Sequence, residues 1–281
     1  NQLTCNARYM DEVERVLYNN VLTGFSLSGD KYTYQNPLNT DKPDRWEWHV
    51  CPCCPPMFLK IMAAMPGYIY AYQGDNVYVN LFIGSEVRIP VGDNSVRLKQ
   101  LTSYPWHGAV SIQVNPDKAS TFSMKVRIPG WAQGTENPYD LYQSNLKAPV
   151  KLKVNQEDVL LRIVDGYAEI NREWKKGDHI ELELPMQPRL ITANKAVENL
   201  RGQVALASGP IIYCFEDADN PELQTFKLQA QTPLELSHDS NLLNGVNIIK
   251  CQGDIPAKAI PYYAVANREE SHSYKVWIPQ K

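Results

Sequence analysis

The sequence predicts a mainly β protein with a helical segment at its N-terminal end. Two observations carry this prediction. Apolar residues recur at helical spacing before Gly67, and after it they alternate with polar residues in short runs. Gly, Asn, Asp and Pro separate these runs, a pattern that is typical of antiparallel strands packed as a sandwich.

The N-terminal segment, residues 1–66, contains two predicted helices. The first covers residues 9–21, about four turns, and Gly24 ends it. The second begins at Pro56, whose missing N–H suits a first helical turn, and it ends at Pro66. Two amphipathic helices cannot bury their apolar faces against each other and still form a complete domain. We therefore interpret this segment as the tail of a larger helical domain.

Two β segments follow. The second segment begins near Pro188. Within it, the stretch 216–260 is polar and weakly periodic, which predicts a loop-rich connection. Predicted strands of the first segment cover 68–70, 77–83, 87–91, 96–98, 110–114, 122–128, 159–163, 167–170 and 179–184, and those of the second cover 204–206, 211–215 and 274–278.

Composition excludes several classes of function. The 281 residues are 43% hydrophobic and 21% charged, with a net charge of -3 and no basic stripe, so we expect no nucleic-acid partner. No apolar run reaches the ~20 residues of a membrane span. We expect a soluble protein, cytoplasmic or periplasmic, and the compartment stays open. Cys5, Cys214 and Cys251 are too scattered to indicate a disulfide framework.

The other three cysteines form the block Cys51-Pro52-Cys53-Cys54-Pro55-Pro56. Cys53 and Cys54 precede the second predicted helix, where free N–H groups and the helix dipole favour an anion and lower a thiol pKa. Neighbouring cysteines form a disulfide only through a strained ring. The block therefore indicates metal binding, thiolate catalysis or both, with buried or incidentally paired thiols as the alternative.

Residues near this block offer further candidates. Trp46 and Tyr34, with Trp48 and Tyr32, form either a sugar-stacking wall or ordinary packing between domains. His49 is either a ligand or, as is commoner for a lone loop histidine, a surface residue. Asp44 and Glu47 are either carboxylates of the site or, as is commoner, solvated charges, and we assign neither as acid/base. The Tyr104-Pro105-Trp106 motif indicates packing within the sandwich, with a carbohydrate contact as the alternative.

The sequence resembles the cysteine-dependent β-L-arabinofuranosidases of glycoside hydrolase family 127. The resemblance spans essentially the whole chain. Matching blocks are ARYMDEVERVLYN at 7–19, YTYQNPL at 32–38, CPCCPP at 51–56, TSYPWHG at 102–108, VRIPGWA at 126–132, REWKKGD at 172–178 and RGQVALASGPIIYCFE at 201–216.

The resemblance implies a fold and a division into domains. Residues 1–66 are expected to be the C-terminal helices of a truncated (α/α)6 catalytic barrel. Two β-sandwich domains are expected at 67–187 and 188–281. A non-catalytic carbohydrate-binding or scaffold protein is the alternative, because β-sandwiches often serve that way, and a zinc or redox site without sugar chemistry is a third reading.

The resemblance also implies a retaining mechanism in which a zinc-bound cysteine attacks the anomeric carbon. Cys53 matches the nucleophile and a zinc ligand, and Cys54 a further zinc ligand. Tyr34 matches a sugar-contacting tyrosine, and Cys51 a preceding cysteine near the site. We expect Tyr34, Cys51 and Trp46 on the substrate side.

The family pattern also includes a Glu-x-Cys pair and an acid/base glutamate upstream of the first helix, and none of these matches this sequence. We therefore expect the chain to be the C-terminal part of the enzyme, inactive alone and weak in zinc binding. Its expected partners are a carbohydrate substrate, namely an L-arabinofuranoside or a related plant glycan, the missing N-terminal barrel region, and a second copy of the chain. The apolar faces with Val13, Leu17, Phe58 and Met62 are expected to be exposed unless such a partner covers them.

Overall fold

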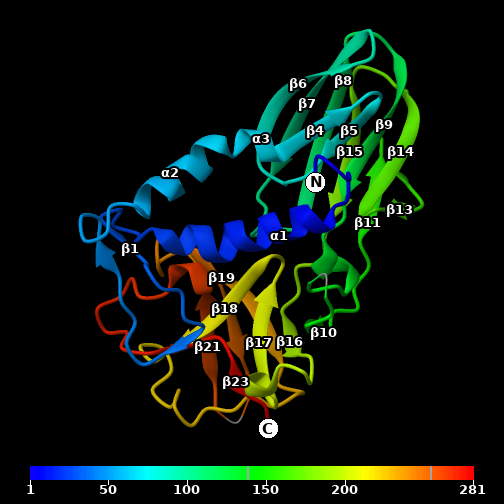
Figure 1. Cartoon of the computed structure of the whole chain (residues 1–281). Helices are drawn as coiled ribbons and strands as arrows, with labels where there is room; N and C mark the ends of the chain where they lie inside the picture. Colours follow the sequence, from blue (N-terminus) through cyan, green and yellow to red (C-terminus); the bar gives the residue numbers. More distant parts are fainter. Residues whose placement is uncertain (138, 254) are drawn as a thin grey trace. The chain divides into compact units, whose positions relative to one another are not determined.

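The computed structural model describes residues 1–137, 139–253 and 255–281 (Figure 1). It confirms the predicted fold class, because helices are few and most elements are strands in several sheets. The described chain divides into two compact units. Unit 1 comprises 1–13, 63–133 and 147–186, and unit 2 comprises 14–62, 134–146 and 187–281.

Unit 1 contains a six-stranded and a five-stranded sheet. All strand pairs in them are antiparallel except β5 with β9, which is parallel. In sheet order, the first holds β12 (Glu157–Asp158), β11 (Lys151–Val154), β15 (Asp178–Glu183), β8 (Ala109–Pro116), β7 (Asn94–Thr102) and β6 (Ser85–Val91), and the second holds β13 (Ile163–Val164), β14 (Tyr167–Trp174), β9 (Ser120–Arg127), β5 (Asn76–Val79) and β4 (Tyr70–Gln73).

Alternation of side chains produces the core of unit 1. On β7, Val96 and Leu98 are fully buried while Arg97 and Lys99 between and beyond them are exposed, as expected for a sheet with one buried face. The largest buried side chain is Trp174, whose Nε1 donates to the carbonyl of Phe122 at 3.0 Å.

Unit 2 is built on a ten-stranded sheet. Its main path runs β10 (Tyr142–Ser144), β16 (Arg189–Ala193), β17 (Gln203–Ser208), β18 (Ile211–Glu216), β21 (Ala257–Pro261), β20 (Val246–Cys251) and β19 (Leu234–Asp239), while β2 (Asn39–Thr40), β22 (Tyr274–Lys275) and β23 (Ile278–Pro279) pair off this path. A segment from the N-terminal part of the chain, β2, thus contributes to the sheet of the C-terminal part.

Three expectations about strands were wrong. The stretch 216–260 contains β19 and β20, which pair over six residues each. Residues 159–163, predicted as a strand, lie almost wholly outside strands, and Leu160 among them is 92% exposed. Tyr68 and Ile69 belong to the short helix α3 (Pro66–Ile69), so strand β4 begins only at Tyr70.

The first helix is less regular than expected. It consists of α1 (Arg8–Val16), a π-helical turn η1 (Leu17–Val21) and a 3-10 turn η2 (Leu22–Gly24). Asn19 in η1 explains the widened turn, because its Nδ2 donates both to the carbonyl of Arg15 at 2.9 Å and to that of Pro210 at 2.8 Å. The amide of Ile212 donates to Asn19 Oδ1 at 2.7 Å, so η1 is anchored on strand β18 of unit 2.

The expectation of exposed helix faces was wrong for Leu17 and is confirmed for Met62. Leu17 is 6% exposed, and Val13 and Phe58 are half-buried. Within unit 1, the fully buried Arg127 contacts Asp11 of α1 at 2.7 Å, which holds the start of this helix. Only α2 (Pro55–Ala64) keeps the expected exposure, with Met57, Leu59 and Met62 in solvent. Among the described residues, no helix is long and apolar enough to cross a membrane.

Candidate active site

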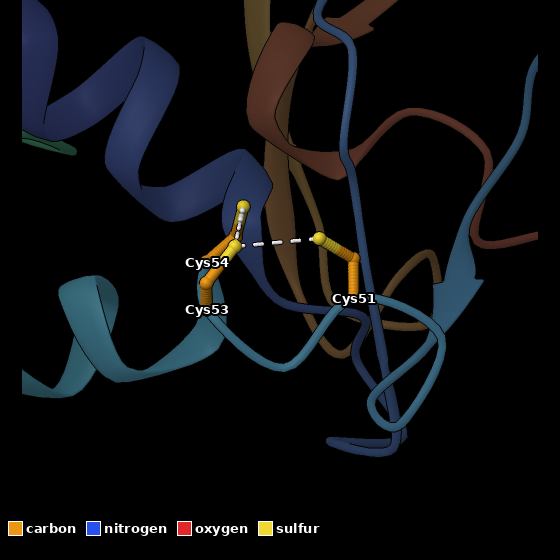
Figure 2. Close-up of side chains that lie close together, drawn as sticks. All are labelled: Cys51, Cys53 and Cys54. Carbon is orange, nitrogen blue, oxygen red and sulfur yellow. Dashed lines mark hydrogen bonds between the residues drawn. The ribbon is translucent and has the colours of Figure 1, made fainter.

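The three clustered cysteines bring their sulfur atoms to one point in unit 2 (Figure 2). Cys51 Sγ lies 3.3 Å from Cys53 Sγ, which lies 3.6 Å from Cys54 Sγ. All three sulfurs are within 4.8 Å of one another. Cys53 is exposed, whereas Cys51 and Cys54 are half-buried and all three are free thiols. The middle sulfur is therefore the one open to a reactant.

Local sequence produces this arrangement. Helix α2 begins at Pro55, directly after Cys54, and the amide of Met57 donates to the carbonyl of Cys54 at 3.0 Å. Proline suits the first helical positions because it has no N–H to leave unpaired there. Pro52 separates Cys51 from Cys53. The loop turns back between these residues, so that Cys51 Sγ points toward Cys53 Sγ, as Figure 2 shows.

The sulfurs influence each other's acidity. Hydrogen bonds from Cys51 and Cys54 lower the pKa of Cys53 below its ordinary value of 9.0. The hydrogen bond to Cys53 raises the pKa of Cys54 to about 11. Of these two thiols, Cys53 is the one that ionises first, and Cys54 stays protonated at neutral pH. The neighbouring thiols are the main cause of the lowered pKa of Cys53. The sequence had suggested the helix N-terminus as the cause.

The three sulfurs form the donor set of a soft metal ion. Zinc bound by thiolates at ~2.3 Å in a tetrahedral site places its sulfurs roughly 3.8 Å apart. The two observed separations of 3.3 and 3.6 Å are close to that edge length. Among the described residues, Cys51, Cys53 and Cys54 form the group of three or more His, Cys, Asp or Glu side chains whose ligand atoms lie close enough together to hold one metal ion. The residues present therefore fit zinc.

An aromatic group lies beside the cysteines. Strand β1 (Lys31–Tyr32) pairs with β3 (Trp46–Glu47), and this register puts Tyr32 opposite Trp46. Tyr34 and Trp46 stack with ring centroids 4.4 Å apart and an interplanar angle of 2°. The buried Tyr32 donates its hydroxyl to the carbonyl of Cys51 at 3.2 Å, which connects the group to the cysteine loop. Burial, followed by nearby Cys51 and Cys54, raises the pKa of Tyr32.

Arg45 holds this loop in place, and sequence reasoning missed it. Its Nε and Nη2 donate to the carbonyl of Val265 at 3.1 and 2.8 Å, and its Nη1 donates to the carbonyl of Thr23 at 2.9 Å. A longer contact of 3.4 Å reaches the carbonyl of Tyr263. Burial lowers the pKa of Arg45 to about 10. The sequence signal was weak, because a single arginine between Asp44 and Trp46 in a polar stretch resembles a surface residue.

The remaining candidates near the site take structural positions. His49 is exposed and lies 3.6 Å from Glu47, outside the cysteine group. Asp44 Oδ2 accepts from Trp46 Nε1 at 2.6 Å, so that carboxylate orients the indole. Trp48 donates to the carbonyl of Gly29 at 3.0 Å. In unit 1, Tyr104 is buried against Phe82, as expected of packing within the sandwich.

Known families match along the chain in three consecutive blocks. Residues 1–67 match the beta-L-arabinofuranosidase, GH127 catalytic domain. Residues 76–186 match the beta-L-arabinofuranosidase, GH127 middle domain. Residues 188–279 match the glycoside hydrolase family 127 C-terminal domain.

Individual relatives agree with these matches. The non-reducing end beta-L-arabinofuranosidase of Bifidobacterium longum subsp. longum is 29% identical over 311 residues, covering 93% of this chain and 44% of the relative. A solved GH127 beta-arabinofuranosidase has a TM-score of 0.92 and 34% identity, covering 99% of this chain and 46% of that one. A solved GH127 beta-L-arabinofuranosidase from Geobacillus stearothermophilus T6 has a TM-score of 0.90 and 34% identity, covering 100% of this chain and 47% of that one. The chain spans about half the length of the relatives it matches.

Proposed function

Because the chain belongs to glycoside hydrolase family 127, we propose that it carries the nucleophile of a retaining β-L-arabinofuranosidase. Cys53 is that nucleophile. The substrate class is a glycan with a terminal L-arabinofuranose, as the names of the relatives suggest. The single observation that supports this most is the exposed sulfur of Cys53 within hydrogen-bonding distance of two neighbouring thiols.

The chemistry follows from a thiolate at that position. The Cys53 sulfur attacks the anomeric carbon, forming a C–S bond while the bond from that carbon to the leaving oxygen breaks. The leaving oxygen takes a proton from a general acid. Water then attacks the same carbon as the general base removes a proton, the C–S bond breaks and the thiolate is restored. Two inversions give net retention.

The general acid/base is a separate group, because the nucleophile cannot also protonate the leaving oxygen from the opposite side of the bond. The cysteine group contains no carboxylate among the described residues. We assign this role to the part of the relatives' length that this chain does not span, and on that account the 281 residues alone are inactive.

Zinc is the metal for this site. Cys53 and Cys54 would hold it, with Cys51 converging on the same point. When bound, zinc would keep the sulfur of Cys53 deprotonated at neutral pH. Cys53 and Cys54 supply two ligands, fewer than the three of a usual catalytic site or the four of a structural one, so zinc binding to this chain alone is weak.

The aromatic group supplies the substrate side of the site. Tyr34 is 45% exposed and its ring is held parallel to Trp46, so the pair offers a flat apolar surface to the sugar face. Cys51 lies at the other side of the cysteine group, with its carbonyl bound by Tyr32. The same proposal divides the chain into the end of a helical catalytic domain at 1–66, a first sandwich at 67–187 and a second at 188–281.

Turnover tests the proposal directly. In the protein that contains these residues at the length of its relatives, Cys53→Ala should lower kcat/KM for an aryl β-L-arabinofuranoside on the order of 10³-fold or more. Cys5→Ser, at a half-buried thiol of unit 1, is the matched control and should leave turnover unchanged. Wild-type turnover in Cys53→Ala would refute the assignment. Saturable sugar binding without turnover in the wild type would favour a non-catalytic carbohydrate-binding protein.

A further inference from the structure

Unit 2 contains a cavity of about 270 Å³. Helical turn η1 contributes Asn19 to its wall, the sheet contributes Ile191 and Ala205, and aromatic side chains come from Tyr142 and Trp277. Among the described residues, none that line this cavity belongs to the cysteine group or to the aromatic group beside it. The cavity is therefore a separate feature of the molecule.

Two polar atoms on residues that line this cavity have no hydrogen-bond partner within the described chain. They are Trp277 Nε1, a donor, and Asn36 Oδ1, an acceptor. Trp277 is only 6% exposed. A buried polar atom without a partner is uncommon in proteins and costs stability. A molecule in the cavity is the nearest source of the missing partners.

The wall around these atoms is fixed. Asn39 Oδ1 accepts from the amides of Val276 and Trp277 at 2.9 and 3.0 Å, and Asn39 Nδ2 donates to the carbonyl of Trp277 at 3.1 Å. The rings of Tyr142 and Trp277 pack with centroids 5.8 Å apart. Asn39 thus holds the backbone at Trp277, and burial beside Tyr142 restricts rotation of the indole toward another partner. The cavity is formed before any ligand arrives.

Two charged residues line the wall, Arg15 and Glu136, and both already interact with other groups of the chain. Glu136 is buried and accepts from Arg189 Nε at 2.6 Å and Nη2 at 3.0 Å, so both of its oxygens are engaged. An anion would meet this carboxylate, and a carboxylate oxygen could not donate to Asn36 Oδ1. An ammonium group could not accept from Trp277 Nε1. A hydroxyl group both donates and accepts, so a neutral molecule with several hydroxyls fits both atoms.

Size and shape restrict the molecule further. Small-molecule pockets commonly measure roughly 300–1,000 Å³, and this cavity lies just below that range. Apolar and aromatic side chains form most of the wall, with Tyr142, Ile191 and Ala205 among them. A sugar ring combines a flat C–H face with hydroxyls at its edge. We propose that this cavity is a second sugar site, which binds one neutral pentose or hexose unit apart from the cysteine centre.

The test uses the 281-residue chain and L-arabinose, a probe chosen because of the proposed function. Titration followed by indole ¹H–¹⁵N resonances should shift the signal of Trp277 saturably, with a Kd on the order of 1 mM. Trp277→Phe identifies that signal and keeps an aromatic ring. Affinity measured from the sugar's own resonances should fall about threefold to tenfold in Trp277→Phe and in Asn36→Ala, as expected for one lost hydrogen bond each.

Controls separate this site from the cysteine centre. Cys53→Ser should leave sugar binding at the cavity unchanged, so failure of the proposed nucleophile and failure of this site give different results. D-galacturonate, a ring-closed anion that keeps the ring configuration of L-arabinopyranose and adds a carboxylate at C5, should bind at least tenfold more weakly. The proposal is overturned if the Trp277 signal does not shift at about a hundred times the expected Kd, which would mean that the cavity holds water only. Equal binding of the anion, or loss of binding in Cys53→Ser, would overturn it as well.

Discussion

Arg45 should control both the stability of unit 2 and the reactivity of the cysteine site. It lies next to Trp46 on the loop that leads to Cys51, and its guanidinium donates to the carbonyls of Thr23 and Val265. Arg45→Met keeps the length of the side chain and removes every donor. The loop should then lose its connection to two other segments of the unit.

The magnitude follows from the contacts. Hydrogen bonds from a charged donor contribute about 1.5–3 kcal/mol each. Two carbonyls keep a partner after the change, because Thr33 Oγ1 donates to Thr23 at 3.0 Å and Asn267 Nδ2 donates to Val265 at 3.3 Å. Burial of the cation, which lowers the pKa of Arg45 to about 10, offsets part of the gain. We expect Arg45→Met to cost about 2–4 kcal/mol, and Arg45→Lys, which cannot reproduce the fork, about 1–2 kcal/mol.

Urea unfolding of the chain measures this cost, and iodoacetamide modification of Cys53 measures the effect on the site. Arg201→Met, at an exposed arginine paired with Glu198, is the control and should stay within about 0.5 kcal/mol of wild type. In Arg45→Met the modification of Cys53 should follow a pH profile closer to that of an ordinary thiol. Unchanged stability together with an unchanged profile would show that Arg45 does not hold the loop.

Three further predictions rest on other contacts. As the pH rises, the rate of Cys53 alkylation should reach half its maximum at a pH below the ordinary thiol pKa of 9.0. Cys51→Ala and Cys54→Ala should each move this midpoint to higher pH, because each removes a donor to the sulfur, and an unmoved midpoint would contradict this. Hydrogen exchange should be fast in α2, where Met57 and Leu59 are exposed, and slow in η1, where Leu17 and Asn19 are buried; equal protection would contradict the docking of η1. Gly166→Ala should lower the free energy of unfolding in urea by about 1–3 kcal/mol more than Gly134→Ala. Both glycines have φ near +80°, but only at Gly166 would an added Cβ lie 2.6 Å from Ala7 Cβ, so equal costs would refute the clash.

Much of the fold could be predicted because one face of each long strand is buried. Alternation located β7, β8, β9 and β14. It failed at residues 159–163, where apolar side chains such as Leu160 stay in solvent and so have no sheet to pack on. It also failed at β19, whose side chains are only partly buried at the end of the sheet path, so that polar residues occupy both faces.

The site was predictable in its residues and less so in its geometry. The sequence indicated Cys53 and Cys54 before a helix, and α2 begins at Pro55. It did not indicate that Cys51 would bring its sulfur within 3.3 Å of Cys53, because that distance depends on how the loop turns at Pro52. Nor did it indicate the hydrogen bonds of Arg45, whose partners are backbone carbonyls more than twenty and more than two hundred residues away. Every residue has a backbone carbonyl, so the sequence does not indicate which of them accepts from a given side chain.

Trapping the reaction intermediate tests the central claim most directly. The protein at the length of its relatives should be quenched with acid during turnover of an aryl β-L-arabinofuranoside and then digested for peptide mass spectrometry. The account predicts one pentosyl unit in thioether linkage to Cys53, with Cys51 and Cys54 unmodified. A pentosyl adduct on a carboxylate, or steady turnover with no adduct on Cys53 in an enzyme that retains configuration, would contradict it.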